Sequence, residues 1–167
     1  MSTPFELSKY LGTWYELIHY PSWFQRNDHY NTTAEYTMNP DGTVEVRNYS
    51  ISHGTEFNSV GTATLLTDNG FWVNFAPKEI ASLQQSGEFI HLDHPIDITP
   101  HINYVVEKLW TNQFGEYIFA VVTDDKHDSL YLLSRYPHPS LISYNELISY
   151  VIDHFDRDRL VQTPHFY

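Results

Sequence analysis

The chain has 167 residues, a length that suits one domain over residues 1–167 and buries about two-thirds of the surface exposed by the unfolded form. No cysteine is present, which excludes disulfides, zinc–thiolate sites and thiol nucleophiles. The 21 acidic and 9 basic side chains give a net charge of -12, which repels a phosphate backbone, so nucleic acid is not an expected partner.

Apolar and polar residues alternate with a period of two along most of the chain, in segments separated by turn residues. Pro40 and Gly42 in "NPDG" and the run Asp68, Asn69, Gly70 are typical of hairpin turns. The pattern predicts eight strands, over 12–20, 33–38, 43–50, 59–66, 71–75, 102–110, 116–123 and 129–135.

The period changes near the end of the chain. Apolar residues recur at helical spacing within 140–156, and Ser143 followed by Glu146 is typical of a capping box. We therefore expect a helix over about 140–156, followed by a short terminal strand over about 158–163.

Consecutive strands joined by short turns favour an all-β fold, an eight-stranded antiparallel up-and-down barrel over about 10–136 with the helix packed outside. Closure into a barrel removes exposed strand edges. A β-sandwich is the competing architecture, but it needs Greek-key crossovers, which the short connections do not favour.

The stretch "YLGTWYELIHYPSWFQRN", residues 10–27, resembles the first signature of the lipocalins, most of all the branch of bacterial lipocalin and apolipoprotein D. "TAEYTMNPDGTVEVRN" and "YIFAVVTDDKHDSLYLLSRYP" are similar to later strands of that branch. The resemblance implies that Trp14 and Arg135 form a structural cation–π pair at the closed end of the barrel. It also implies that Gly12 allows close backbone packing there.

Strand alternation selects one inward face, which is mostly apolar with a few hydroxyl groups and one amide. This lining suits a small hydrophobic ligand with a polar end, such as a fatty acid, a lysophospholipid or a sterol. A barrel filled by its own side chains is the alternative, although the inward alanines favour a cavity. The predicted ligand-binding residues are Ala34, Tyr36, Val46, Asn48, Ala63, Phe71, Val73, Phe75, Ala120 and Tyr131.

Two longer connections belong to the open end that the resemblance implies. In the first, we expect Trp23, Phe24 and Tyr30 to be portal residues, or else to pack on a neighbouring loop. The second, residues 76–101, is expected to form a lid or a strand extension. An alternative alignment takes "GEFIHL" within it as the fifth strand.

Few residues suggest chemistry. His91 and His94 flank Asp93, but no second cluster completes a set of metal ligands, so no metal and no cofactor is expected. The sequence lacks a Gly-x-Ser-x-Gly elbow, and we expect no enzymatic activity. Glu16 shares the inward parity of Trp14, where it would act as an acid or base, bond a nearby hydroxyl group or sit at a local irregularity of the strand.

We therefore expect a carrier of a small hydrophobic molecule, present as a monomer or a weak homodimer. The first alternative is a protein-interaction module with a filled barrel. A haem-binding or enzymatic lipocalin ranks after it. No run approaches the length of a transmembrane helix. The start "MSTPFELSKY" lacks the features of a leader, so we expect an intracellular protein if this start is native, and a periplasmic or secreted one only after removal of a signal peptide.

Overall fold

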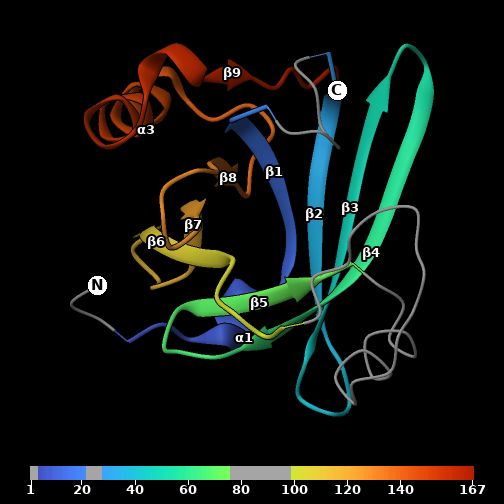
Figure 1. Cartoon of the computed structure of the whole chain (residues 1–167). Coiled ribbons are helices and arrows are strands. Elements are labelled where there is room, and N and C mark those ends of the chain that lie inside the picture. The colour runs from blue at the N-terminus through green and yellow to red at the C-terminus, as the bar shows by residue number, and fades with distance from the viewer. Residues whose placement is uncertain (1–3, 22–27, 76–98) are drawn as a thin grey trace.

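A computed structural model describes residues 4–21, 28–75 and 99–167 of the chain. Figure 1 shows the strands wrapped into a barrel, with one long helix beside it. The elements are α1 (Leu7–Tyr10), β1 (Gly12–His19), β2 (Tyr30–Met38), β3 (Val44–Ser52), β4 (Thr55–Leu65), β5 (Gly70–Asn74), β6 (Tyr104–Thr111), β7 (Tyr117–Thr123), β8 (Tyr131–Ser134), α3 (Leu141–His154), a 3-10 turn (Arg157–Arg159) and β9 (Val161–Gln162).

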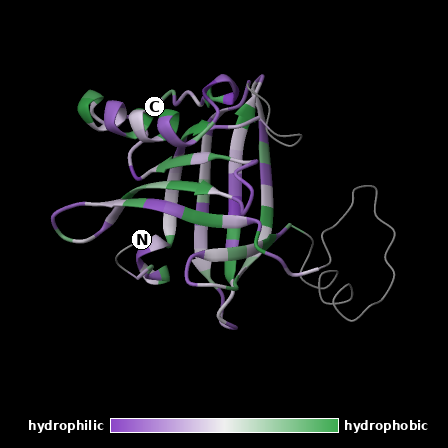
Figure 2. Cartoon of the chain, turned by 60° about the vertical axis from the view of Figure 1, so that its left-hand side comes forward, coloured by the Kyte–Doolittle hydropathy of each residue, from purple (hydrophilic) through white to green (hydrophobic). Residues whose placement is uncertain are grey.

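The strands follow one another in the order β2-β3-β4-β5-β6-β7-β8-β1-β9, and β1 also pairs with β2, which closes the sheet on itself. Every pairing is antiparallel. This topology confirms the up-and-down barrel and rejects the sandwich. Figure 2 shows hydrophilic and hydrophobic bands alternating along the strands, as expected when one face of a sheet is buried and the other is exposed.

The β3–β4 hairpin is longer than the sequence pattern predicted. Its strands continue to Ser52 and resume at Thr55, where the pattern left a gap between the two expected strands. His53 and Gly54 both have positive φ, of 51° and 77°, which is what the tight two-residue hairpin turn requires. Polar residues on both faces of this stretch hide the alternation, because the end of the hairpin is largely exposed.

The end of the barrel next to α1 is closed by an aromatic and cationic pair. The Arg135 guanidinium carbon lies 3.8 Å from the centroid of the Trp14 indole, which is 0% exposed. The indole Nε1 donates to the Tyr10 carbonyl oxygen at 2.8 Å. Gly12 has φ of 102°, a backbone conformation that residues with a side chain rarely adopt. A Cβ at this position would also lie only 3.3 Å from Arg135 Nη1, so glycine fits here on both grounds.

Arg135 also satisfies backbone groups at this end. Its guanidinium donates to the carbonyl oxygens of Thr13 at 2.8 Å, Leu11 at 2.9 Å, Lys9 at 3.0 Å and Tyr117 at 3.3 Å. These acceptors come from α1, β1, β7 and the link between α1 and β1. One side chain therefore ties the N-terminal segment to β7, two strands away from β1 in the barrel.

The C-terminal helix α3 packs on the outside of the barrel, as predicted. Leu147 and Val151 are buried against outward residues of β1, β7 and β8. The start of the helix differs from the expected capping box, because Ser140 is the N-cap and its hydroxyl accepts from the Ser143 backbone N–H at 3.2 Å. No helix among the residues described is long and apolar enough to cross a membrane.

The terminal strand is shorter than the predicted 158–163. Residues Arg157–Arg159 form a 3-10 turn whose N-cap, Asp156, accepts from the Asp158 backbone N–H at 3.0 Å. Only Val161–Gln162 then pairs with β1. The hydrogen bond from the Asp158 backbone N–H to the Asp156 side chain stabilises this turn, so the strand begins later than predicted.

Replacing Arg135 by alanine should destabilise the fold by about 3 kcal/mol, because the carbonyl groups lose a charged donor and Trp14 loses its cation. Arg135→Lys should recover only part of this loss, since an ammonium cannot reproduce the fork of the guanidinium. Urea unfolding followed by circular dichroism measures both. The control is Arg47→Ala, which removes an exposed arginine from β3. An Arg135→Ala variant as stable as this control would contradict the assignment.

Candidate ligand-binding cavity

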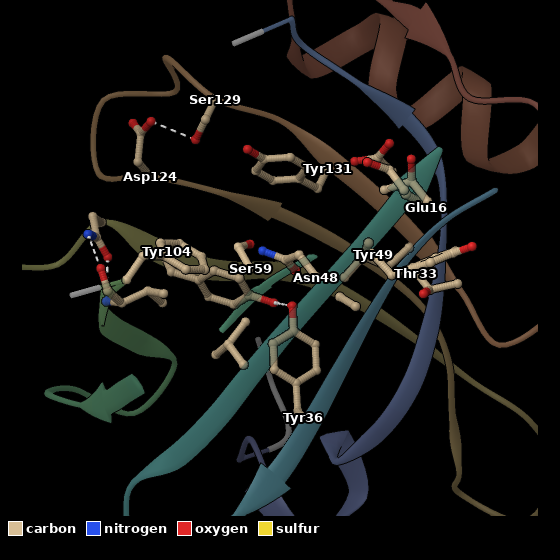
Figure 3. A pocket seen from close by; sticks show the side chains of 18 of the residues that line it. Glu16, Thr33, Tyr36, Asn48, Tyr49, Ser59, Tyr104, Asp124, Ser129 and Tyr131 are labelled. Carbon is tan, nitrogen blue, oxygen red and sulfur yellow. Dashed lines mark hydrogen bonds between the residues drawn. The ribbon is translucent and has the colours of Figure 1, made fainter. Parts of the chain in front are cut away.

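Above the closed end, the barrel encloses a cavity of about 740 Å³. This volume lies within the range of about 300–1,000 Å³ typical of small-molecule sites. Figure 3 shows side chains of several strands converging on it, from Tyr36 at its lower end to the loop between β7 and β8 at its mouth. The wall thus comes from segments far apart in the sequence.

Most of the predicted ligand-binding residues line this cavity. Register explains why, because Ala34 lies opposite Asn48 and Tyr36 opposite Val46 across β2 and β3, which places all four on one face. The predicted residues that line the cavity are Ala34, Tyr36, Val46, Asn48, Val73, Phe75 and Tyr131.

Ala63, Phe71 and Ala120 do not line it, which corrects their predicted position. They point into the barrel and belong to its packed hydrophobic cluster without reaching the cavity wall. The ring of Phe5, from the segment before α1, packs edge-on against Phe71 at 6.0 Å between centroids. Alternation predicts the side of a sheet and not the depth along the barrel, so it could not distinguish the packed end from the open one.

The portal residues have a mixed outcome. Tyr30 does not line the cavity, and its ring packs edge-on against Phe166 near the end of the chain, at 5.3 Å between centroids. This is packing on a neighbouring segment, the alternative that the sequence left open. Trp23 and Phe24 lie outside the described residues, as does most of the predicted lid, 76–98.

A chain of tyrosine hydroxyl groups crosses the lower end of the cavity. The Tyr104 hydroxyl lies 2.5 Å from that of Tyr10 and 2.7 Å from that of Tyr36. Burial raises the pKa of Tyr36 to about 12 and also raises the pKa of Tyr10 and Tyr104. The three phenols therefore stay neutral at physiological pH and satisfy one another in apolar surroundings.

Glu16 provides a buried carboxylate in the cavity wall. It is 3% exposed, and its Oε2 accepts from the Thr163 hydroxyl at 2.6 Å. The expectation that Glu16 bonds a nearby hydroxyl group is thus confirmed. The partner comes from the C-terminal segment beyond β9, a distant part of the sequence that no local pattern connects to β1.

Two buried histidines, His19 and His165, lie within hydrogen-bond distance of Glu16 or of its partner Thr163. An irregularity in the β1–β8 register at Leu17 brings His19 to the same side as Glu16, and its Nδ1 lies 2.9 Å from the Thr163 hydroxyl and 3.2 Å from Glu16 Oε2. His165 Nε2 donates to the Glu16 carbonyl oxygen at 2.6 Å. Burial lowers the pKa of His165, which favours its neutral form.

Sequence reasoning missed several wall residues. Tyr104 shares the parity of buried Val106, and that parity was an available signal. Ser129 shares the parity of Tyr131 and was expected to face inward, but the loop before it, from Asp124 to Asp128, carries no apolar alternation, so nothing local indicated that it borders the cavity. His101 also reaches the cavity, although no histidine was expected to do so.

No candidate metal centre occurs within 4–21, 28–75 and 99–167, where no group of three or more histidine, aspartate or glutamate side chains is arranged to hold an ion. His91, Asp93 and His94 lie outside those ranges. The expectation that they bind no metal stays a prediction.

Comparison with known proteins agrees with this geometry. Residues 5–165 match the family model described as "Lipocalin-like domain". Temperature-induced lipocalin-1 of Arabidopsis thaliana is 26% identical over 162 residues, which cover 95% of this chain and 78% of that protein.

Solved structures show the same fold. Insecticyanin from the tobacco hornworm Manduca sexta matches with a TM-score of 0.63 at 13% identity, covering 99% of this chain and 82% of that one. The cockroach allergen Per a 4 matches with a TM-score of 0.62 at 16% identity, covering 98% and 90%. The fold and the family together support small-molecule binding in the barrel. Because the family model spans nearly the whole chain and the closed barrel agrees with it, this protein belongs to the lipocalin family.

Proposed function

We propose that this protein binds a small hydrophobic molecule with a polar end inside its barrel and carries it without chemical change. The observation that carries the proposal is the cavity of about 740 Å³, whose wall combines apolar side chains with a few polar groups. Fatty acids, lysophospholipids and sterols belong to the class of molecules with this build. The family membership supports the same reading.

Two polar side chains in the wall are available to a ligand. The Asn48 amide and the Tyr131 hydroxyl border the cavity, and neither has a hydrogen-bond partner among the described side chains and backbone. Figure 3 shows both facing the same space. A few such polar groups in an otherwise apolar cavity orient a ligand and supply specificity.

The competing function, an interaction module with a filled barrel, requires side chains to occupy the interior. A cavity of about 740 Å³ argues against that requirement. For catalysis, the absence of cysteine rules out thiol-dependent chemistry. The absorbance of the purified protein in the Soret region tests for haem independently of either argument.

Organic extraction of the purified protein followed by mass spectrometry should release a hydrophobic molecule in near-stoichiometric amount. The unfolded protein, taken through the same extraction, is the control for adventitious lipid. If the extract is clean, the protein should instead take up N-phenyl-1-naphthylamine, a neutral fluorescent probe, with one site per chain. A clean extract together with no uptake of the probe would contradict the proposed function.

Asn48→Phe should block uptake of the same probe, because the ring would occupy the middle of the cavity. The loss of binding should exceed about tenfold, while stability changes little since the space is not filled by other side chains. The matched control is Arg47→Phe, which adds the same ring to the exposed face of the same strand. Equal binding by both variants would place the binding site elsewhere.

A further inference from the structure

The charged side chains that border the cavity are mostly acidic. Within the part of the chain that the structure describes, Glu16, Asp124, Asp125 and Asp128 border it as carboxylates, and Lys126 is the one lysine or arginine. The whole chain has a net charge of -12, so no distant surplus of positive charge offsets this. A ligand carboxylate entering the cavity would therefore meet like charge.

The acidic side chains at the mouth of the cavity and Glu16 in its wall differ in how strongly their charge acts on a bound ligand. Asp124 accepts from the Ser129 hydroxyl and from the backbone N–H groups of Asp128 and Lys126. Partial burial acts to raise the pKa of Asp124, but these hydrogen bonds together outweigh it and lower that pKa. It is thus ionised, but the mouth is open to water and its field is screened by salt. Glu16 is buried, where screening is weak and charge has its largest effect.

The hydrogen bonds behind Glu16 identify it as an acceptor. His19 Nδ1 lies within reach of the Thr163 hydroxyl, and that hydroxyl lies 2.6 Å from Glu16 Oε2. A hydroxyl that accepts from the imidazole donates its own hydrogen onward to the carboxylate. The His19 Nε2 has no partner within the described residues, which fits the tautomer with its hydrogen on Nδ1, because a buried donor without an acceptor would be costly.

Tyr131 lies on the same side of the cavity as Glu16 (Figure 3). Burial raises the pKa of its phenol, and the negative charges of Glu16 and Asp124 raise it further. Tyr131 therefore keeps its proton, and its hydroxyl can either donate or accept. Together Glu16 and Tyr131 form a polar part of the cavity wall. It can accept a hydrogen bond from a ligand, and the charge of Glu16 repels a negatively charged ligand group.

We propose that this cavity selects amphiphiles whose polar end is a neutral or cationic hydrogen-bond donor, an alcohol or an amine, over those that end in a carboxylate. Glu16 is the acceptor that determines this choice. The inference rests on the proposed function and narrows the ligand class of the same site. A carboxylate accepts up to about four hydrogen bonds, so a ligand donor can join those already present.

The test compares dodecylamine, dodecanol and dodecanoate, which share one chain length and differ in the polar end. Each competes with bound N-phenyl-1-naphthylamine at pH 7.5, where the amine is a cation and the acid an anion. The amine and the alcohol should displace the probe at concentrations at least about tenfold below that of dodecanoate. The preference should persist at high salt, because the buried acid is poorly screened.

Glu16→Gln should reduce this preference towards equal competition by the alcohol and the acid, since it removes the charge and keeps the shape. Asp153→Asn is the matched control, an acid-to-amide change on the exposed face of α3, and it should leave the preference unchanged. Circular dichroism establishes that each variant is folded. If Glu16→Gln does not fold, the ranking by the unmodified protein at low and high salt still decides the question.

Two failures are distinguishable. If the neutral probe binds but dodecanoate competes as well as dodecanol, or no dodecyl compound displaces the probe, the selectivity is overturned and the carrier function stands. A folded Glu16→Gln variant with an unchanged preference overturns the role of Glu16. If neither the probe nor any dodecyl compound binds, the proposed function itself fails.

Discussion

The contact between Arg135 and Trp14 is the constraint on which the rest of this barrel depends. A guanidinium 3.8 Å from the centre of a fully buried indole also donates to backbone carbonyls of the N-terminal segment and of β7. The cation–π contact is worth about 0.5–2 kcal/mol, and the charged hydrogen bonds add to it. Because Gly12 has no side chain, the N-terminal segment can approach this arginine closely. The barrel is thereby closed at the end next to α1.

Closure divides the interior into two zones with different chemistry. Near α1, rings from Phe5, Tyr10 and Tyr117 fill the barrel as an ordinary core does. Above the tyrosine hydroxyl chain, side chains do not fill the interior, and the cavity occupies that space. The polar groups of the wall then lie where water or a ligand reaches them, and Glu16 is held there by Thr163 from the far end of the chain. A packed lower zone gives stability, which leaves the upper zone free to be a binding site.

Much of the architecture could be predicted from local patterns. Strand alternation located each of the eight barrel strands, and the helical spacing around Leu147 and Val151 located α3 and its buried stripe. The errors were at element ends. The turn at His53 and Gly54 was missed because the first half of β4, which follows it, is exposed and carries no alternation of buried and exposed residues. The helix cap fell at Ser140 because Ser140 and Ser143 lie within one turn of each other and either can cap.

For this protein, the sequence by itself determined which residues form strands and, for the β2–β3 hairpin, which side faces inward. The pairing of Trp14 with Arg135 was implied by the resemblance to the lipocalins. Periodicity is local, and it is enforced wherever one face of a strand is buried. Only the tertiary structure decided depth and long-range partners. It placed Ala120 in the packed zone, while Asn48 came to line the cavity, and it brought Thr163 and His165 against Glu16. Barrel closure and the return of the C-terminal segment set those distances, and no short window of sequence contains them.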